Sequence, residues 1–226
     1  MALQIIKTSD GSDSLLNADL NETYHSVYGA VQESKHVFVE SGLHYFLANK
    51  NLPEFNILEI GFGTGLNAAL TGEALRDLSN DVTYTSIEAY PLKEEIWTAL
   101  NYGSMLHAEQ FFKQLHQSPW GVPARLTSNF TLLKKETTLQ ETSLEPNEYH
   151  LIYFDAFAPS KQPEMWTFGI LEKITQSLQA SGIFVTYCAK GQLKRDLKAL
   201  GLIVETLPGP PGKMEMVRAI KPESGR

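Results

Sequence analysis

A run of glycines and a set of acidic side chains are the residues of this chain whose types and spacing could do chemistry. The stretch "NILEIGFGTGLN", residues 56–67, joins an apolar run to three glycines at alternate positions, Gly61, Gly63 and Gly65. Alternate glycines between a strand and a helix let the backbone approach a ligand closely, and the helix that follows presents free N–H groups. The stretch predicts a site for a nucleotide-like ligand.

The spacing of the glycines decides between ligand classes. The dinucleotide fingerprint G-x-G-x-x-G would need a glycine where Leu66 stands, and no Lys-Ser/Thr pair follows to make a phosphate-binding P-loop. The order Glu59-x-Gly61-x-Gly63-x-Gly65 instead resembles the first motif of class I methyltransferases, which use S-adenosylmethionine. Such a site holds no phosphate, so Glu59 beside the loop can face the ammonium group of that cofactor.

Further carboxylates follow the next candidate strands. Glu88 ends "YTSIE", where an acidic side chain can accept hydrogen bonds from both ribose hydroxyls. Glu136 follows "FTLLKK" and either contacts the adenine amino group or is an ordinary surface glutamate. Asp155 ends the fourth strand, and ligands of doubly wound sheets lie beyond the carboxyl ends of the strands. We therefore expect Asp155 beside the reactive end of the cofactor.

The elements that position these residues alternate between strand and helix. Candidate strands lie at 55–61, 81–89, 130–134, 149–157, 182–188, 202–207 and 216–220, with helical patterns between most of them. This alternation predicts an α/β fold with a Rossmann-like, doubly wound, mostly parallel sheet. The last two strands are joined by "PGPPGKME", which leaves no room for a crossover helix, so we expect an antiparallel hairpin at the sheet edge.

Two segments decorate that sheet. Residues 1–55 are predicted to form an N-terminal extension, with a hairpin around "TSDGSD" and a helix in which Val31, His36, Val39, Leu43 and Phe46 recur near helical spacing. Residues 56–226 then form the methyltransferase domain. About 40 residues separate its second and third strands, which predicts a helical insertion at about 91–125.

Bulk properties are those of an ordinary globular protein. The chain has 226 residues, 42% of them hydrophobic and 20% charged, and this length favours one domain. No apolar run approaches the roughly 20 residues that span a bilayer, and the N-terminus lacks the pattern of a secretory signal, so we expect a cytoplasmic protein. Cys188 is the only cysteine, which excludes an internal disulfide and a cysteine-based zinc site.

Charge is distributed unevenly along the chain. Residues 1–184 hold 11 Lys/Arg against 22 Asp/Glu, whereas residues 185–226 hold 8 against 4. The net charge of -7 gives no long-range attraction to nucleic acid, so such a partner would need a local basic patch. A solvated basic helix face is the alternative. The candidates for a patch are Lys161, Lys190, Lys194, Arg195 and Lys213.

Four stretches carry a family resemblance that covers most of residues 21–220. "YHSVYGAVQESKHVF", "IGFGTGLN", "IEAYPL" and "YFDAFAPSKQPEMW" are similar to the methyltransferase domain of the MnmC family, including its stand-alone MnmD-type members. The resemblance implies transfer of a methyl group from S-adenosylmethionine to the side-chain amine of 5-aminomethyl-2-thiouridine. That nucleoside lies at the wobble position, in the anticodon region of tRNA, and the product is 5-methylaminomethyl-2-thiouridine.

The resemblance also implies roles for individual residues. Asp155 would be the catalytic residue, the stretch 24–38 would close over the site, and no metal is implied. The cofactor-binding positions are Glu59, Gly61, Phe62, Gly63, Gly65, Asn67, Glu88, Glu136 and Asp155. The substrate-binding positions are Tyr28, Glu33, Phe157, Pro159, Lys161, Trp166 and Lys213.

Two features depart from the family pattern. Fused members continue into an FAD-dependent oxidase domain, whereas this chain ends at Arg226, so it resembles the stand-alone members. A functional link to an enzyme that supplies the aminomethyl group stays open at this point. The basic run typical of the family near the C-terminus is here "GPPGKMEM", which keeps Lys213 but has Gly212 and Met214 where arginines are common. Two other functions stay open at this point: methylation of a small-molecule amine, and RNA binding without catalysis.

Overall fold

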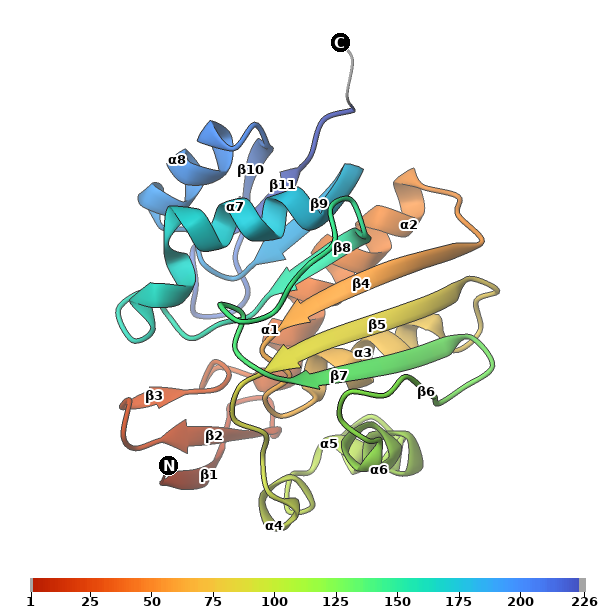
Figure 1. The fold of residues 1–226 in the computed structure, drawn as a ribbon. Coiled ribbons are helices and arrows are strands. Elements are labelled where there is room, and N and C mark those ends of the chain that lie inside the picture. Colours follow the sequence, from red (N-terminus) through yellow and green to blue (C-terminus); the bar gives the residue numbers. More distant parts are fainter. Residues whose placement is uncertain (1, 224–226) are drawn as a thin grey trace.

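A computed structural model describes residues 2–223 of the chain. Within them, eight strands form one sheet in the order β10-β11-β9-β8-β4-β5-β7-β6, seen in Figure 1. The strands are β4 (Glu54–Ile60), β5 (Asp81–Glu88), β6 (Ala124–Arg125), β7 (Phe130–Glu136), β8 (Tyr149–Phe154), β9 (Leu178–Thr186), β10 (Ile203–Pro208) and β11 (Glu215–Ile220).

The centre of the sheet is parallel, as the alternation of elements predicted. Strand β4 pairs in parallel with β5 and β8, β5 pairs with β7, and β8 pairs with β9. Strands β10 and β11 form the predicted antiparallel hairpin. Its second strand turns inward and pairs antiparallel with β9, so β10 is the edge strand.

Helices cover both faces of the sheet, because successive side chains of a strand point to opposite sides. On one face Ile57 of β4 joins a buried cluster with side chains of η1 (Lys35–His44), a π-helical segment, and α3 (Leu66–Leu75). On the other, Leu58 is buried with side chains of α7 (Phe168–Ser177) and α8 (Gly191–Ala199). Figure 1 shows the two helical layers on either side of the strands.

The N-terminal segment supplies a small sheet and a helical run. Strands β1 (Leu3–Lys7), β2 (Asp13–Asn17) and β3 (Glu22–Thr23) pair antiparallel and lie beside the arrowheads of β4, β5 and β7 in Figure 1. Helix α1 (Ala30–Ser34) continues through η1 into α2 (Tyr45–Asn49). This run shares the hydrophobic core of the sheet, and the domain boundary at residue 55 stays a prediction.

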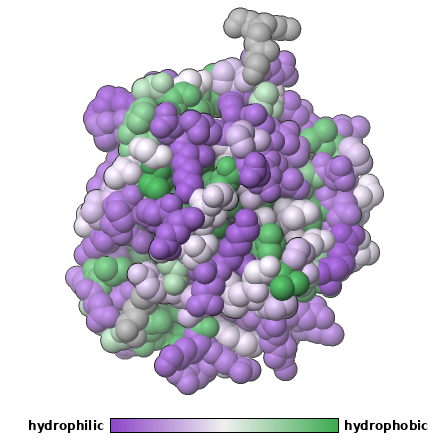
Figure 2. Space-filling model, in the orientation of Figure 1, coloured by the Kyte–Doolittle hydropathy of each residue, from purple (hydrophilic) through white to green (hydrophobic). Residues whose placement is uncertain are grey.

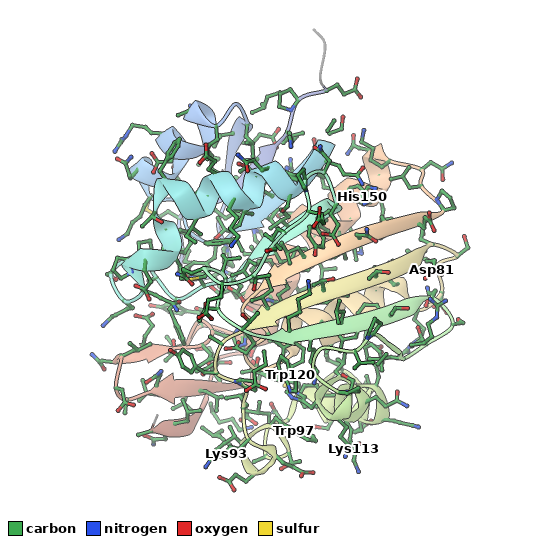
Figure 3. All side chains as sticks on the ribbon, viewed as in Figure 1. Asp81, Lys93, Trp97, Lys113, Trp120 and His150 are labelled. Carbon is green, nitrogen blue, oxygen red and sulfur yellow. The ribbon has the colours of Figure 1, made fainter. Side chains whose placement is uncertain are left out.

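The predicted insertion contains short helices between β5 and β7. These are α4 (Glu94–Trp97), α5 (Tyr102–Met105) and α6 (Glu109–Gln117). Trp97, Phe112 and Leu115 are buried. Figure 3 shows Trp97 and Trp120 on the side of the insertion that faces the sheet. A 3-10 helix, η2 (Pro163–Trp166), follows β8.

The surface is mainly hydrophilic, with small separate hydrophobic areas in the view of Figure 2. Among residues 2–223, no helix has the length and apolar character needed to cross a membrane.

Close packing of η1 on the sheet gives a stability prediction. A Cβ atom on Gly42 would lie 3.1 Å from Val185 Cγ2 and 3.2 Å from Tyr153 Cε1, both in the core. Gly42→Val should overpack this contact and lower the free energy of unfolding by about 1–3 kcal/mol. Urea denaturation measures the change. Ala48→Val, at an exposed position of α2, is the matched control and should cost less than about 1 kcal/mol. Equal losses in the two variants would contradict the packing argument.

Candidate functional site

A cavity of about 510 Å³ lies at the carboxyl ends of the parallel strands. Its floor is formed by the glycine loop after β4, the end of β5 and the segments that follow β7 and β8. Its roof is formed by residues 24–28, here called the strap, and by Gly212 and Lys213 of the β10–β11 loop. The volume is in the range of small-molecule and cofactor sites.

Gly61 holds the glycine loop against the end of β8. Its φ angle is +93°, and its N–H donates to the carbonyl oxygen of Ile87 at 2.9 Å. A Cβ atom at this position would lie 2.9 Å from the carbonyl oxygen of Asp155. Because side chains disfavour this φ and no room is left for one, the position requires glycine.

Glu88 is fixed by two backbone groups at the edge of the cavity. The N–H of Gly63 donates to its Oε2 and the N–H of Tyr90 to its Oε1, each at 2.8 Å. Burial raises the pKa of Glu88, and these hydrogen bonds oppose the rise. Each carboxylate oxygen keeps a further lone pair, which can accept a ligand hydroxyl.

Asp155 is oriented by the first turn of α3. Asn67 Nδ2 donates to Asp155 Oδ2 at 2.8 Å. Burial and the negative charge of Glu33 raise the pKa of Asp155 to about 7, while the Asn67 hydrogen bond and the charge of Lys213 oppose the rise. A carboxyl group with this pKa can both accept and release a proton near neutral pH.

The strap is attached to the floor of the cavity at two points. The ring of Tyr24 packs edge-on against Phe157, with centroids 5.0 Å apart. His25 Nε2 lies 2.7 Å from Thr64 Oγ1 in the glycine loop. Burial lowers the pKa of His25 to about 4, so the ring is neutral at pH 7.

The strap also meets the β10–β11 loop. Gly212 has φ +84°, and a Cβ atom there would lie 2.0 Å from Cδ2 of the Tyr28 ring. Glu33 of α1 is only 6% exposed; its Oε2 accepts from the Ser26 N–H at 2.7 Å, and its Oε1 lies 2.5 Å from Lys213 Nζ. The two parts of the roof are therefore joined by a ring contact and an ion pair.

The insertion supports the glycine loop from the side opposite the cavity. The His116 ring stacks on Trp97 with centroids 4.6 Å apart, and its Nε2 lies 3.1 Å from the carbonyl oxygen of Thr64. Burial lowers the pKa of His116 to about 3, so the neutral ring donates to that oxygen. Lys134 Nζ donates to the His116 carbonyl oxygen at 2.7 Å and lies over the ring of Trp120.

Most of the residues named from the sequence come together at this cavity. Those that line it are Gly61, Phe62, Gly63, Asn67, Glu88, Asp155, Tyr28, Glu33, Phe157 and Lys213. Those that do not are Glu59, Gly65, Glu136, Pro159, Lys161 and Trp166.

The structure does not support the expected contact between Glu59 and the cofactor's ammonium group. Strand alternation turns this side chain toward α3, where it is fully buried, and Ser86 Oγ donates to its Oε2 at 2.6 Å. Burial raises the pKa of Glu59 to about 8 despite that hydrogen bond. Glu59 is not among the residues that line the cavity, and its contact with the cofactor's ammonium group stays a prediction.

Four other residues lie behind or outside the cavity wall. Glu136 is exposed at the carboxyl end of β7, and Pro159 is not among the lining residues, although Ala158 before it and Gln162 after it are. Trp166 Nε1 donates to the Phe157 carbonyl oxygen at 2.8 Å, which holds that loop in place. Lys161 Nζ donates to the Leu20 carbonyl oxygen at 3.0 Å, so it joins the loop to the N-terminal sheet.

Sequence reasoning missed several residues that line the cavity. They come from the strap, from the glycine loop, from the segments after β5 and β7, and from the position after β9. The family resemblance placed the stretch 24–38 over the site and the glycine motif contains Thr64, but no pattern marks the other three. The missed residues are Tyr24, His25, Thr64, Tyr90, Gln140 and Tyr187.

The charges of the cavity suit a cationic ligand. Its walls carry the carboxyl groups of Glu22, Glu33, Glu88, Asp155 and Glu164. S-adenosylmethionine carries a sulfonium and an ammonium group, and the contact of its ribose hydroxyls with Glu88 stays a prediction. Within the part of the chain that the structure describes, no three His, Cys, Asp or Glu side chains gather as metal ligands.

Comparison with known proteins gives a family model and several similar proteins. A family model described as S-adenosyl-L-methionine-dependent methyltransferase matches residues 107–222, which include Asp155 and Lys213. A tRNA 5-methylaminomethyl-2-thiouridine biosynthesis bifunctional protein MnmC from Ralstonia nicotianae is 28% identical over 93% of this chain. Its counterpart from Cupriavidus metallidurans is 29% identical over 88%. The chain spans 33% and 31% of the length of these curated relatives.

A solved structure extends the similarity to the whole fold. The crystal structure of MNMC2 from Aquifex aeolicus matches this chain with a TM-score of 0.79 and 25% sequence identity. The match covers 99% of this chain and 73% of the MNMC2 chain. The match therefore includes the N-terminal segment and the first part of the insertion, which lie before residue 107, where the match to the family model begins.

The geometry of Glu88 predicts the effect of its removal on cofactor binding. Glu88→Ala deletes the acceptor for the ribose hydroxyls and releases Gly63, so affinity for S-adenosylmethionine should fall about ten- to a hundredfold, or roughly 1.5–3 kcal/mol. Calorimetry measures the affinity. Glu136→Ala is the matched control, because Glu136 is the register partner of Glu88 on β7 yet lies outside the cavity. A folded Glu88→Ala protein with unchanged affinity would refute the assignment.

Proposed function

The chain belongs to the S-adenosyl-L-methionine-dependent methyltransferase family, and from that premise we propose that it methylates the side-chain amine of 5-aminomethyl-2-thiouridine at the wobble position of tRNA. The names of the similar proteins point to this nucleoside. The product would be 5-methylaminomethyl-2-thiouridine. An enzyme that acts on tRNA would work in the cytoplasm.

The observation that carries the proposal is the position of Asp155. It lines the same cavity as the glycine loop and Glu88, and its carboxyl group has a pKa of about 7. Methylation of an amine needs a neutral nitrogen lone pair, whereas an alkylamine is mostly protonated in water at pH 7. A carboxylate beside the methyl donor can accept that proton and orient the lone pair.

Other residues of the cavity bind the cofactor, orient Asp155 and stack on the base. Glu88 and the backbone of Gly63 hold the cofactor, which supplies an electrophilic methyl group when bound. Asn67 fixes the carboxylate of Asp155 through its hydrogen bond. Phe157 and the strap tyrosines supply flat apolar surfaces against which a pyrimidine base can stack.

The deciding experiment uses tRNA that carries the aminomethyl group. Purified protein, S-adenosylmethionine and this tRNA are incubated, and the wobble nucleosides are analysed by mass spectrometry; we expect a gain of one methyl group on the side-chain amine. Methylation of free amines but not of tRNA would favour a small-molecule methyltransferase. Binding of tRNA without methyl transfer would favour a catalytically silent RNA-binding protein.

Asp155→Asn should retain the fold and cofactor affinity but lower the rate of methyl transfer by about a hundredfold or more, because an amide does not accept the amine proton. In the wild-type protein the free carboxylate is the active form. The rate should therefore rise as pH increases through about 7, the pKa of Asp155. Single-turnover rates from pH 5.5 to 8.5 measure both effects. A variant as fast as wild type would show that Asp155 is structural.

Binding of tRNA by this acidic protein requires local cations. Lys161 and Lys213 contact Leu20 and Glu33, so they are already engaged within the protein. Lys190 and Arg195 are exposed at α8, next to the carboxyl end of β9, and Lys194 forms a partly exposed ion pair with Glu215. The α8 group is therefore the better candidate for phosphate contacts.

Replacing the α8 group should weaken tRNA binding in a salt-dependent way. In Lys190→Ala/Lys194→Ala/Arg195→Ala, each lost phosphate contact should reduce the slope of log affinity against log salt by about one. Titration with tRNA at several salt concentrations measures the slope, and cofactor affinity should be unchanged. An unaltered slope would direct attention to the N-terminal sheet and the insertion.

A further inference from the structure

Lys213 is the one lysine or arginine among the described residues that line the cavity. Its Nζ lies 2.5 Å from Glu33 Oε1 and 3.7 Å from the centroid of the Tyr187 ring. The Tyr187 hydroxyl donates to the carbonyl oxygen of Ala156 at 2.8 Å. The ammonium group thus lies over a ring whose hydroxyl is hydrogen-bonded to the residue that follows Asp155.

This arrangement costs free energy that simple packing would not require. Glu33 is only 6% exposed whereas the Lys213 side chain is 32% exposed, so the buried carboxylate loses hydration that its attraction to the partly exposed ammonium group only partly restores. An apolar pair of similar volume could join the strap to the β10–β11 loop equally well. The two charges therefore need an explanation. Both act on the pKa of Asp155, which Glu33 raises and Lys213 lowers.

We propose that Glu33 and Lys213 form a charge pair that sets the proton affinity of Asp155 and of the acceptor amine, so that the amine reacts as a neutral nucleophile. The pair acts through Asp155 and is a positioning element of the site. The part that concerns the amine rests on the proposed function.

The chemistry explains why a cation is useful here. An incoming alkylammonium is attracted by Asp155 and by the other carboxyl groups of the cavity, which would stabilise its charged, unreactive form. The fixed ammonium group of Lys213 destabilises the charged form of the amine and so favours loss of the amine's proton. The proton passes to the Asp155 carboxylate; the nitrogen lone pair then forms the N–C bond while the C–S bond of the sulfonium breaks and its electron pair stays on sulfur.

Other groups around Asp155 contribute to the same field. Glu59 of β4 and Glu88 of β5 lie on the sheet side, Glu22 and His25 on the side of the N-terminal sheet and strap, and Glu164 on η2. Tyr24, Tyr28, Tyr90 and Tyr187 also line the cavity. Lys213 is the only permanent cation in this set of described residues, which makes its charge the most informative one to remove.

Two variants with opposite predicted effects test the proposal. Lys213→Met removes the positive charge and keeps the apolar stem on Tyr187, so the pKa of Asp155 should rise. Glu33→Gln removes the negative charge and leaves Lys213 charged, so the pKa of Asp155 should fall. The pKa of Asp155 should change by about one pH unit in each direction, because each variant removes one charge that shares the cavity with Asp155. The double variant should lie between the two.

The first measurement needs neither substrate nor cofactor. Protein labelled with ¹³C at the aspartate carboxyl carbons, of which the chain has seven, is titrated by NMR, and Asp155→Asn identifies the signal of interest. The second measurement is the pH dependence of single-turnover methyl transfer to aminomethyl-bearing tRNA. Its acid limb should move to higher pH in Lys213→Met and to lower pH in Glu33→Gln.

A matched pair of variants controls for general charge effects. Asp81→Asn and Arg125→Met remove the partners of an exposed ion pair with a 2.6 Å contact at the amino-terminal end of β5, and Figure 3 shows Asp81 at that end of the sheet. Both variants should leave the Asp155 titration unchanged.

The possible results of these measurements distinguish the charge-pair proposal from the proposed function. Shifts of the Asp155 titration in the same direction, or no shift, would overturn the charge-pair proposal whatever the activity. Weaker binding of S-adenosylmethionine to Lys213→Met with an unmoved titration would mean that Lys213 binds the cofactor carboxylate, which also overturns it. Opposed shifts together with no methylation of tRNA by the wild-type protein would uphold the effect on Asp155 and reject the proposed function.

Discussion

The close approach of β4 and β8 at their carboxyl ends is the constraint on which the site depends. Gly61 has a positive φ angle, and its missing side chain leaves room for the carbonyl oxygen of Asp155, which would lie 2.9 Å from any Cβ atom. The same approach brings Asn67, in the first turn of α3, to the carboxylate of Asp155. The glycine loop and the Asp155 side chain are therefore parts of one junction, and a change that separates the strands would disturb both.

The contacts that hold the roof of the cavity are weaker than those that hold the floor, and they join residues that are farther apart in the sequence. The strap and the β10–β11 loop are about 180 residues apart in the chain, and they meet through Tyr28 on Gly212 and through the Glu33–Lys213 ion pair. The floor is instead held by sheet hydrogen bonds and by the hydrophobic core. Local opening of a protein begins where few buried contacts must be broken. We infer that ligands enter by displacement of the roof while the floor keeps its shape.

The sequence predicts the parts of the molecule that follow local rules. Strand and helix periodicity predicted the parallel sheet, the length of the connecting loop predicted the antiparallel hairpin, and strand-end position predicted that Glu88 and Asp155 would share a cavity. Side-chain direction was harder to predict, since Glu59 faces α3 and not the ligand space. The strap could not be located from local patterns, because contacts such as His25 to Thr64 join residues that are 39 positions apart.

Burial determines which charges remain effective near the reacting atoms. His25 and His116 are neutral at pH 7 because burial lowers their pKa values to about 4 and 3, and Glu59 is mostly neutral because burial raises its pKa to about 8. These groups serve as hydrogen-bonding partners that shape the glycine loop and its support. Glu33 and Lys213 are the charged groups that act on Asp155, and electrostatic interactions are stronger in surroundings that are less polar than water. Under these conditions a single ion pair in the roof can change the proton affinity of the carboxylate that faces it.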